Sequence, residues 1–206
     1  MPKIELLHID CMEYMATLPD KAFELAIVDP PYGIGNCLVD GGGTRKAKFD
    51  NNRKSVMWDT IPDDKYFIEL FRISKNQIIW GGNYFNLPPT RCNLIWDKMQ
   101  EFTGSDFELA WTSFEKASKA FRMSRVEAYS EGKSHPTQKP VALYKWLLHN
   151  YAKPGDRILD THGGSRSLAI ACHQMGFDHV SCELDKDYHE ASVKRFKEQT
   201  KQLSLL

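Results

Sequence analysis

An acid, two prolines and a tyrosine directly follow an apolar segment in the stretch "LAIVDPPYGIG". The residue before a proline favours extended conformations, and proline itself has no N–H donor. Asp29-Pro30-Pro31-Tyr32 is therefore expected to be a stiff segment that presents a carboxylate and free carbonyls beside an aromatic ring. These acceptors suit a planar group with an amino donor, such as a nucleobase. A rigid turn is the alternative, and it explains the prolines but neither the acid nor the tyrosine.

Acidic residues end three further apolar segments. Asp10, Asp160 and Glu183 each follow a short apolar stretch, as Asp29 does, and a Gly-Gly-Ser sequence lies at 163–165. A single acid in such a place is most often a helix cap. Four acids, with Pro-Pro-Tyr after one of them and Gly-Gly-Ser after another, indicate a common binding site instead.

Apolar stretches of strand length alternate with helical patterns along the chain. The expected strands are 4–9, 24–28, 77–80, 93–96, 107–114, 156–160 and 179–183. The expected helices are 11–18, 63–74, 140–151, 165–175 and 185–202, with Asp63 or Asp64 as a cap, Pro140 in a first turn and Gly176 as a stop. The segment near 120–126 is expected to form a hairpin with 107–114. This alternation predicts an α/β fold with a mostly parallel sheet and helices on both faces.

The parallel arrangement predicts where the unusual residues meet. Right-handed crossovers place the carboxyl ends of the strands along one edge, where ligands bind in such folds. We find no repeat or linker that divides the chain, so residues 1–206 are expected to form a single domain. The expected core includes Trp80, Trp96 and Trp111, and on the last helix Tyr188, Ala191, Val193 and Phe196.

Charge alone does not indicate a nucleic-acid binder. The chain has 27 basic and 27 acidic residues, whereas such binders usually carry an excess of positive charge. A local patch is present in "TRKAKFDNNRK" at 44–54, which contains Arg45, Lys46, Lys48, Arg53 and Lys54. It follows three glycines, so a DNA-binding loop and an ordinary solvated loop tip are both open.

Composition excludes several other classes of protein. No stretch approaches the roughly 20 apolar residues of a membrane span, and the first residues show no signal-peptide core, so we expect a cytoplasmic protein. The five cysteines are widely spread and no pair has Cys-x-x-Cys spacing. Neither a disulfide framework nor a metal site is expected.

Three motifs in a particular order resemble a known family. "DPPY" at 29–32, "HPTQKP" at 135–140 and "DTHGGS" at 160–165 are similar to the motifs of amino-methyltransferases of DNA, in the circularly permuted order called the beta group. The resemblance covers most of the chain. It implies a Rossmann-like fold with a seven-stranded sheet, one strand of which is antiparallel near an edge. It also implies that S-adenosyl-L-methionine is the cofactor and that the exocyclic N6 of adenine in DNA is methylated.

The resemblance assigns roles to the Asp-Pro-Pro-Tyr segment. Asp29 and the carbonyl of Pro30 would accept hydrogen bonds from the amino group of a base flipped out of the duplex. Pro31 would keep the segment stiff, and Tyr32 would stack on the base. The alternatives are a cytosine-N4 methyltransferase, which more often has Ser at the position of Asp29, and a non-catalytic DNA-binding relative that has lost its cofactor.

The resemblance also assigns a cofactor site to residues from both halves of the sequence. The expected set is Asp10, Cys11, Asp29, Thr137, Lys139, Asp160, Thr161, His162, Gly163, Gly164, Ser165 and Glu183. Within it, Glu183 would hold the ribose hydroxyls, and Thr137 and Lys139 the methionine carboxylate. The glycine segment departs from the family pattern, because Thr161-His162 replaces Pro-Phe and Arg166 replaces the last glycine. The Arg166 side chain would either fill space near the methionine or point away along the helix.

The chain lacks the long recognition insert of many such enzymes. Two loops, 34–57 and 98–134, are left to read DNA, and the second adds Arg122 and Arg125 to the basic residues of the first. A DNA-recognition region of this size is expected to recognise a short site or to act with a second subunit, so a homodimer is left open. By analogy, the expected context is restriction–modification or phage protection.

Overall fold

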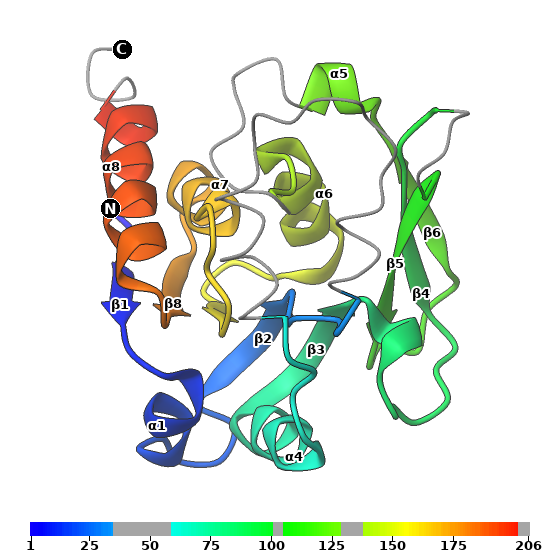
Figure 1. The fold of residues 1–206 in the computed structure, drawn as a ribbon, viewed down its shortest axis with the longest axis horizontal. Coiled ribbons are helices and arrows are strands. Elements are labelled where there is room, and N and C mark those ends of the chain that lie inside the picture. Colours follow the sequence, from blue (N-terminus) through cyan, green and yellow to red (C-terminus); the bar gives the residue numbers. More distant parts are fainter. Residues whose placement is uncertain (35–58, 101–104, 129–137, 202–206) are drawn as a thin grey trace, which may run out of the picture.

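The computed structural model describes residues 1–34, 59–100, 105–128 and 138–201. Its centre is one sheet whose strand order is β1-β8-β7-β2-β3-β5-β4-β6 (Figure 1). The strands in this order are Ile4–His8, Asp178–Glu183, Arg157–Asp160, Phe23–Val28, Ser74–Trp80, Phe107–Thr112, Asn93–Asp97 and Lys119–Arg122. Only β5 runs against its neighbours β3 and β4; every other pairing of described strands is parallel.

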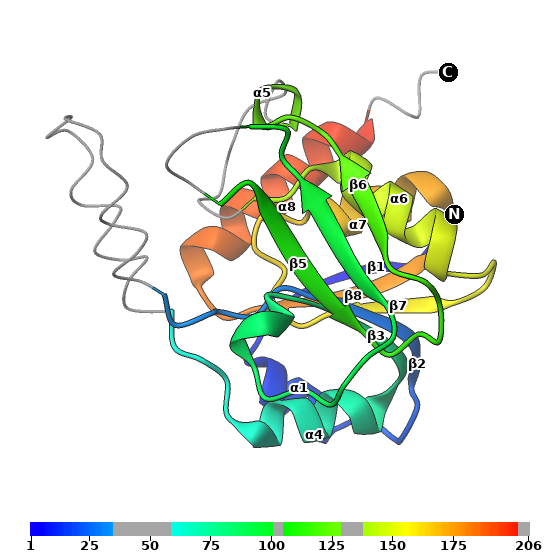
Figure 2. The same cartoon turned by 90° about the vertical axis from the view of Figure 1, so that its right-hand side faces the viewer.

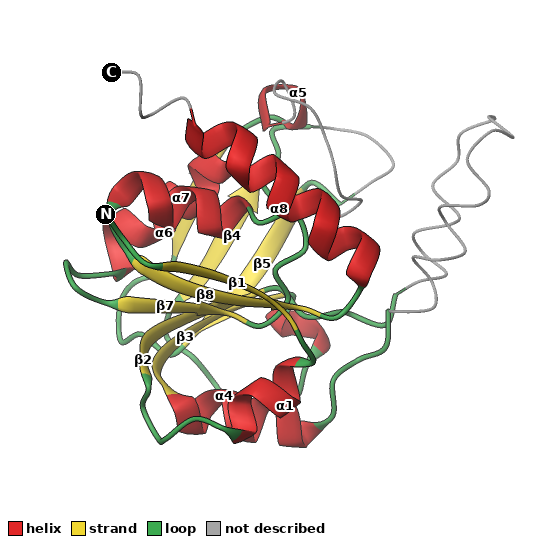
Figure 3. Ribbon diagram, turned by 90° about the vertical axis from the view of Figure 1, so that its left-hand side faces the viewer, coloured by secondary structure: helices red, strands yellow, loops and turns green. Residues whose placement is uncertain are grey.

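Helices cover both faces of the sheet, as the alternation of elements predicts (Figure 3). The helices α1 (Cys11–Ala16) and α4 (Asp64–Ile73) lie on one face. The other face carries α6 (Val141–Tyr151), α7 (Ser167–Met175) and α8 (Lys186–Lys201). Two short helices, η1 (Gly82–Tyr84) and α5 (Arg125–Ala128), lie in connections. The mostly parallel α/β fold is therefore confirmed.

The side chains of a buried strand pack into two cores, because successive side chains point to opposite faces of the sheet. Leu25 and Ile27 of β2 pack with Trp80 and the apolar residues of α6, whereas Ala26 and Val28 pack with those of α1 and α4. Trp80, Trp96 and Trp111 all lie in the core, as expected. A strand buried on both faces reads as a continuous apolar run, which is the pattern that "ELAIV" shows.

The sheet differs from the prediction at its β6 edge (Figure 2). It has eight strands rather than seven, because β6 adds to β4 in parallel, with Leu94 opposite Lys119. The expected hairpin between β5 and this segment is wrong. Both edges of β5 are already paired, one with β3 and the other with β4, so β6 can join only the free edge of β4.

The buried face of α8 also differs from the prediction. Ala191 is exposed and Ser192 is buried, while Tyr188, Val193 and Phe196 are half-buried. Tyr188, Ser192 and Phe196 follow a spacing of four residues, so they share one face of the helix. Ala191 was assigned to the core for its apolar character, but it is exposed and the neighbouring Ser192 is buried instead.

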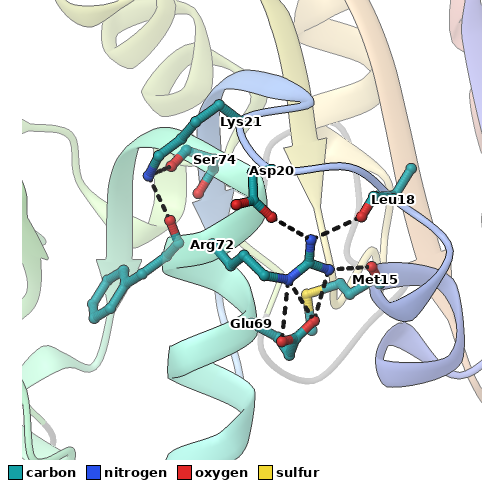
Figure 4. A network of polar contacts seen from close by, with 8 residues as sticks. Met15, Leu18, Asp20, Lys21, Glu69, Arg72 and Ser74 are labelled. Atoms are coloured by element: carbon teal, nitrogen blue, oxygen red, sulfur yellow. Dashed lines mark hydrogen bonds and ion pairs between the residues drawn. The ribbon is translucent and has the colours of Figure 1, made fainter.

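Arg72 ties α4 to the end of α1 (Figure 4). Its guanidinium donates to the carbonyl oxygens of Met15 at 2.9 Å and Leu18 at 2.8 Å, and it pairs with Asp20 and Glu69. These carbonyls belong to the last turn of α1 and the residues after it, where a helix leaves acceptors without intrahelical partners. The contact fixes α1, and with it the residues that connect β1 to α1.

No helix within the described ranges combines the length and apolar character that crossing a bilayer requires.

Candidate active site

Four neighbouring strands end in acidic residues along one edge of the sheet. In sheet order, Asp10 follows β1, Glu183 ends β8, Asp160 ends β7 and Asp29 follows β2. The register places His8 opposite Glu183 and Asp160 opposite Ser181, so these strand ends are nearly level. The prediction that the acids meet at one edge is confirmed, because the strands that precede them are adjacent and parallel.

The Asp-Pro-Pro-Tyr segment is fixed from two sides. The Tyr32 hydroxyl donates to Oδ1 of Asp29, and Oδ1 of Asp59 accepts from the backbone N–H groups of Tyr32 and Gly33 at 3.0 and 2.9 Å. Gly81, just after β3, has φ of 69°, and a Cβ there would lie 2.2 Å from the Tyr32 ring. A glycine at this position lets the tyrosine ring lie against the end of β3.

A second tyrosine lies against Tyr32. The ring of Tyr84, in η1, stacks on that of Tyr32 with centroids 5.1 Å apart and an interplanar angle of 16°, and Phe85 meets Tyr32 edge-on. Tyr84 is 44% exposed, so the aromatic pair opens to solvent. Sequence reasoning assigned no site role to Tyr84. Its position directly after a buried strand, at the edge where the acids lie, was the available signal.

Lys139 lies between two carboxylates. Its buried ammonium donates to Oδ2 of Asp29 and pairs with Oε2 of Glu108 at 3.0 Å, while Oε1 of Glu108 pairs with Lys98 at 3.0 Å. This ammonium was expected at a methionine carboxylate, but here it contacts two carboxylates of the protein itself. Glu108 was not selected from the sequence, although an acid in the otherwise apolar strand "FELAWT" was a signal.

Burial and the nearby charges shift the ionisation of this group of residues. Burial raises the pKa of Asp29, and the Lys139 ammonium opposes the rise. Burial also acts to raise the pKa of Glu108, but Lys139 and Lys98 outweigh it, so the pKa is lowered overall. Burial acts to lower the pKa of Lys139, but the two carboxylates outweigh it and raise the pKa. Lys139 is therefore held as an ammonium.

The turn between β7 and α7 is tied to the neighbouring strand and to α4. The backbone N–H of His162 donates to Oδ1 of Asp160 at 3.0 Å, and that of Gly164 donates to Oε2 of Glu183 at 2.8 Å. The hydroxyl of Thr161 meets that of Tyr66 in α4 at 2.6 Å. Tyr66 was not selected from the sequence as a site residue. The Ser165 hydroxyl meets that of Ser167 at 3.1 Å.

Arg166 folds back beneath this turn and does not point away along the helix. Its fully buried guanidinium donates to the Ser181 hydroxyl at 2.5 Å and lies 3.2 Å from Nδ1 of His189. The residue has φ of 60°, the left-handed conformation that the family glycine adopts readily, so α7 begins at Ser167 rather than at 165. Arg166 fills the space under Gly163, where a Cβ would lie 1.9 Å from Nη1 of Arg166.

Asp10 and Cys11 lie at the start of α1. Asp10 caps the helix by accepting from the N–H of Met12 at 2.7 Å and that of Glu13 at 3.1 Å. Burial and the charge of Asp10 raise the pKa of Cys11 to about 12, so its thiol stays protonated. Burial lowers the pKa of His162 to about 4, and the charge of Asp10 opposes that change. His162 is thus a neutral ring near Asp10.

Several expected site residues lie outside the described ranges, and two others lie on β6 and α5. Thr137 and the basic residues Arg45, Lys46, Lys48, Arg53 and Lys54 fall outside the described residues. Of the loops 34–57 and 98–134, the structure describes 34, 98–100 and 105–128. Arg122 is exposed on β6 and pairs with Asp97 at 3.3 Å, and Arg125 begins α5.

The edge therefore combines two kinds of chemistry. Asp29 offers a carboxylate acceptor beside the stacked rings of Tyr32 and Tyr84. At the end of the adjacent strand, the turn after β7 offers backbone groups beside the carboxylate of Glu183. The first set suits a planar molecule with amino donors, and the second suits hydroxyl groups and a small polar tail.

Comparison with known proteins gives a consistent result. Residues 61–194 match the family model N6_N4_Mtase, described as DNA methylase. The chain is 25% identical over 201 residues to "Putative methylase YubD" of Escherichia coli (strain K12), covering 90% of this chain and 87% of that protein. It is 21% identical over 243 residues to the Type II methyltransferase M2.DpnII of Streptococcus pneumoniae, covering 94% and 89% of the two chains.

Solved structures share the fold. The crystal structure of the M1.HpyAVI-SAM complex superposes with a TM-score of 0.60 at 17% identity, covering 95% of this chain and 100% of that one. The PvuII DNA methyltransferase, named as cytosine-N4-specific, superposes with a TM-score of 0.59 at 14% identity, covering 97% and 93%. The fold is thus that of the Rossmann-like methyltransferases.

Proposed function

Because the chain belongs to the N6_N4_Mtase family of DNA methylases, we propose that it transfers a methyl group from S-adenosyl-L-methionine to the N6 amino group of adenine in DNA. The observation that carries this proposal is the position of Asp29 beside the stacked rings of Tyr32 and Tyr84, at the same edge as the glycine turn after β7. Methyl transfer to a base requires a group that accepts the amino hydrogens of the base, close to a turn that binds the cofactor.

Asp29 and Pro30 act on the amino group of the base. The nitrogen lone pair of an exocyclic amino group is conjugated with the ring, so it is a poor nucleophile. Hydrogen bonds from the amino group to the Asp29 carboxylate and the Pro30 carbonyl favour a more tetrahedral nitrogen, and they stabilise the positive charge that develops there. The base must leave the duplex first, and Tyr32 offers it a stacking surface outside the helix.

The residues of the glycine turn fit the proposed cofactor. S-adenosyl-L-methionine supplies an electrophilic methyl group on a sulfonium, and the structure of M1.HpyAVI is titled as a complex with SAM. Glu183 would hold the ribose hydroxyls, since its carboxylate is fixed by the N–H groups of Gly164 and Asp185 and retains further acceptor positions. The turn at 161–165 would contact the methionine part, and Asp10 and Cys11 the adenine ring.

The carboxylate at position 29 favours adenine over cytosine. In the resembling family, cytosine-N4 enzymes more often have Ser where this chain has Asp29. The fold does not separate the two activities, because PvuII methyltransferase, which is named for cytosine N4, has a similar one. The methylated base therefore has to be identified directly.

Methyl transfer to duplex DNA with labelled S-adenosyl-L-methionine tests the proposal. We expect the wild type to yield N6-methyladenine on digestion to nucleosides and mass spectrometry. Asp29→Ala is expected to lower kcat at least about 100-fold, because it removes the acceptor for the amino hydrogens. The matched control is Asp64→Asn, an exposed acid on α4, which is expected to retain full activity.

Each alternative gives a different result. N4-methylcytosine as the product would replace the adenine assignment and keep the mechanism. No methyl transfer, together with no binding of S-adenosyl-L-methionine in calorimetry, would identify a non-catalytic relative. Full activity of Asp29→Ala would remove Asp29 from the mechanism.

A further inference from the structure

The target-facing acid of the proposed site belongs to a chain of alternating charges. This charge chain consists of Lys98, Glu108, Lys139 and Asp29, joined in that order by ion pairs. Its members come from four separate segments: the residue after β4, the strand β5, the residues before α6, and the end of β2. Two ammonium groups and two carboxylates balance within it.

The antiparallel direction of β5 brings Glu108 to the site. Parallel strands end at the active edge, so their first residues lie at the opposite edge. β5 runs the other way, with Trp80 at the end of β3 opposite Ala110, so its beginning lies where β3 ends. Glu108 therefore reaches Lys139, and Lys139 contacts both carboxylates.

Lys139 is too buried to be an incidental surface ion pair. Its side chain is 2% exposed, and its ammonium also lies 5.1 Å from the centroid of the Trp80 ring. A buried ammonium is costly unless it is paired and hydrogen-bonded. Here the pairing is complete, because both of its carboxylate partners are close and Lys98 compensates the second of them.

The position of Asp29 explains what the ammonium can do. Within the described residues, the titratable groups that act on Asp29 or are acted on by it are Tyr32, Glu108, Lys139, Tyr144 and Asp160. Lys139 is the sole cation among them. Without it, a desolvated carboxylate would face two further acids and would take up a proton. A protonated Asp29 has lost the negative charge that stabilises a developing positive nitrogen.

We propose that Lys139, oriented by Glu108, is a positioning residue for the methyl transfer, which keeps the Asp29 carboxylate ionised and directed toward the amino group of the target base. This inference rests on the proposed function, and it assigns to Lys139 a role through Asp29 rather than contact with the cofactor. Because Glu108 shares the Lys139 ammonium with Asp29, the Asp29 carboxylate remains a strong hydrogen-bond acceptor for the base.

The pH dependence of kcat separates this role from a structural one. In Lys139→Met, the pKa of Asp29 rises, so the acid limb of the kcat profile is expected to move upward by about 1 to 3 pH units. Activity lost near neutral pH then returns at alkaline pH. Glu108→Gln removes a negative charge near Asp29 and leaves the Lys139 ammonium paired with Asp29 alone. The pKa of Asp29 then falls, so the acid limb of the kcat profile is expected to move to lower pH. Lys139→Arg keeps the cation and is expected to shift the limb less than Lys139→Met.

The control is Lys75→Met, which removes a surface lysine that pairs with Glu24 at 3.0 Å and is expected to leave the profile unchanged. Shifts in opposite directions for Lys139→Met and Glu108→Gln support the inference, because loss of packing would lower kcat at every pH. If the wild type methylates DNA and neither limb moves, the inference is overturned while the proposed function stands. If Lys139→Met does not fold, Glu108→Gln alone decides. A wild type that transfers no methyl group overturns both proposals.

Discussion

Burial and direct charge contacts together determine the ionisation of individual residues at this edge. Asp160 is 5% exposed at the end of β7, and burial raises its pKa to about 7 although the N–H of His162 and the charge of Arg166 act in the opposite direction. Burial also raises the pKa of Asp29, but the ammonium of Lys139 opposes the rise. Burial thus raises the pKa of both carboxylates, and Asp29 has in addition an ammonium in direct contact that opposes the rise.

The raised pKa of Asp160 predicts a pH-dependent stability. Below about pH 4 the carboxyl group is protonated in both the folded and the unfolded chain. Between about pH 4 and pH 7 the unfolded chain releases the proton while the folded chain keeps it, so stability falls as the pH rises, and above pH 7 the loss is complete. Asp160→Asn removes this loss.

We therefore expect Asp160→Asn to gain free energy of unfolding relative to the wild type as the pH rises, by on the order of 2–4 kcal/mol at about pH 8. The asparagine carbonyl can still accept from the N–H of His162. Urea denaturation at about pH 5 and about pH 8 measures the difference, and the acidic condition serves as the internal control. An equal effect at the two pH values would contradict the raised pKa.

At the scale of elements, the start of α7 and the end of β8 form one packed unit. The turn at 161–166 is tied to Glu183 by Gly164, and it is filled from below by Arg166, which reaches Ser181. The family glycine that Arg166 replaces would leave this space empty. Gly163 and Arg166 are consequently fitted to one another.

This fit predicts a non-additive pair of substitutions. Gly163→Ala is expected to destabilise the protein by about 1–3 kcal/mol, because the new Cβ would lie 1.9 Å from Nη1 of Arg166. Arg166→Gly is also destabilising, since it removes a buried side chain and its bond to Ser181. The double variant lacks the clash, so its loss is expected to be smaller than the sum by about 0.5–3 kcal/mol. Urea denaturation of the four proteins measures the coupling, and strict additivity would disprove it.

At the scale of the whole molecule, one sheet joins the two ends of the sequence. The first strand, β1, pairs with the last, β8, and the four strands of the acidic edge come from both halves of the chain. The other half of the sheet, β3 to β6, packs on the same α6 that covers β2 and β7. No boundary between independent units is evident in the described part of the sheet.

The chain is therefore expected to unfold in a single cooperative transition. Trp80, Trp96 and Trp111 report on β3, β4 and β5, whereas far-UV circular dichroism reports on all elements. Thermal or urea transitions followed by tryptophan fluorescence and by circular dichroism are expected to coincide. Two separated transitions would show that the chain contains more than one unit.

The local pattern of the sequence determined the alternation of elements, the burial of β2 on both faces and the four acids at strand ends. These features depend on period and on neighbouring residues, so they can be read along the chain. The three motifs likewise indicated the DNA methylases, and the comparison confirms that family. Asp63 and Gly176 act at the ends of α4 and α7 as predicted, because capping is a local interaction.

Only the tertiary structure decided which residues distant in sequence meet. Glu108 reaches both Lys98 and Lys139 because β5 runs antiparallel, and β6 joins β4 because both edges of β5 are occupied. Tyr84 reaches Tyr32 because the ends of β2 and β3 are adjacent. Strand direction and strand order arise from pairing across the whole sheet, and no local period records them, so the sequence indicated Asp29 and Lys139 as site residues but not the ion pair that joins them.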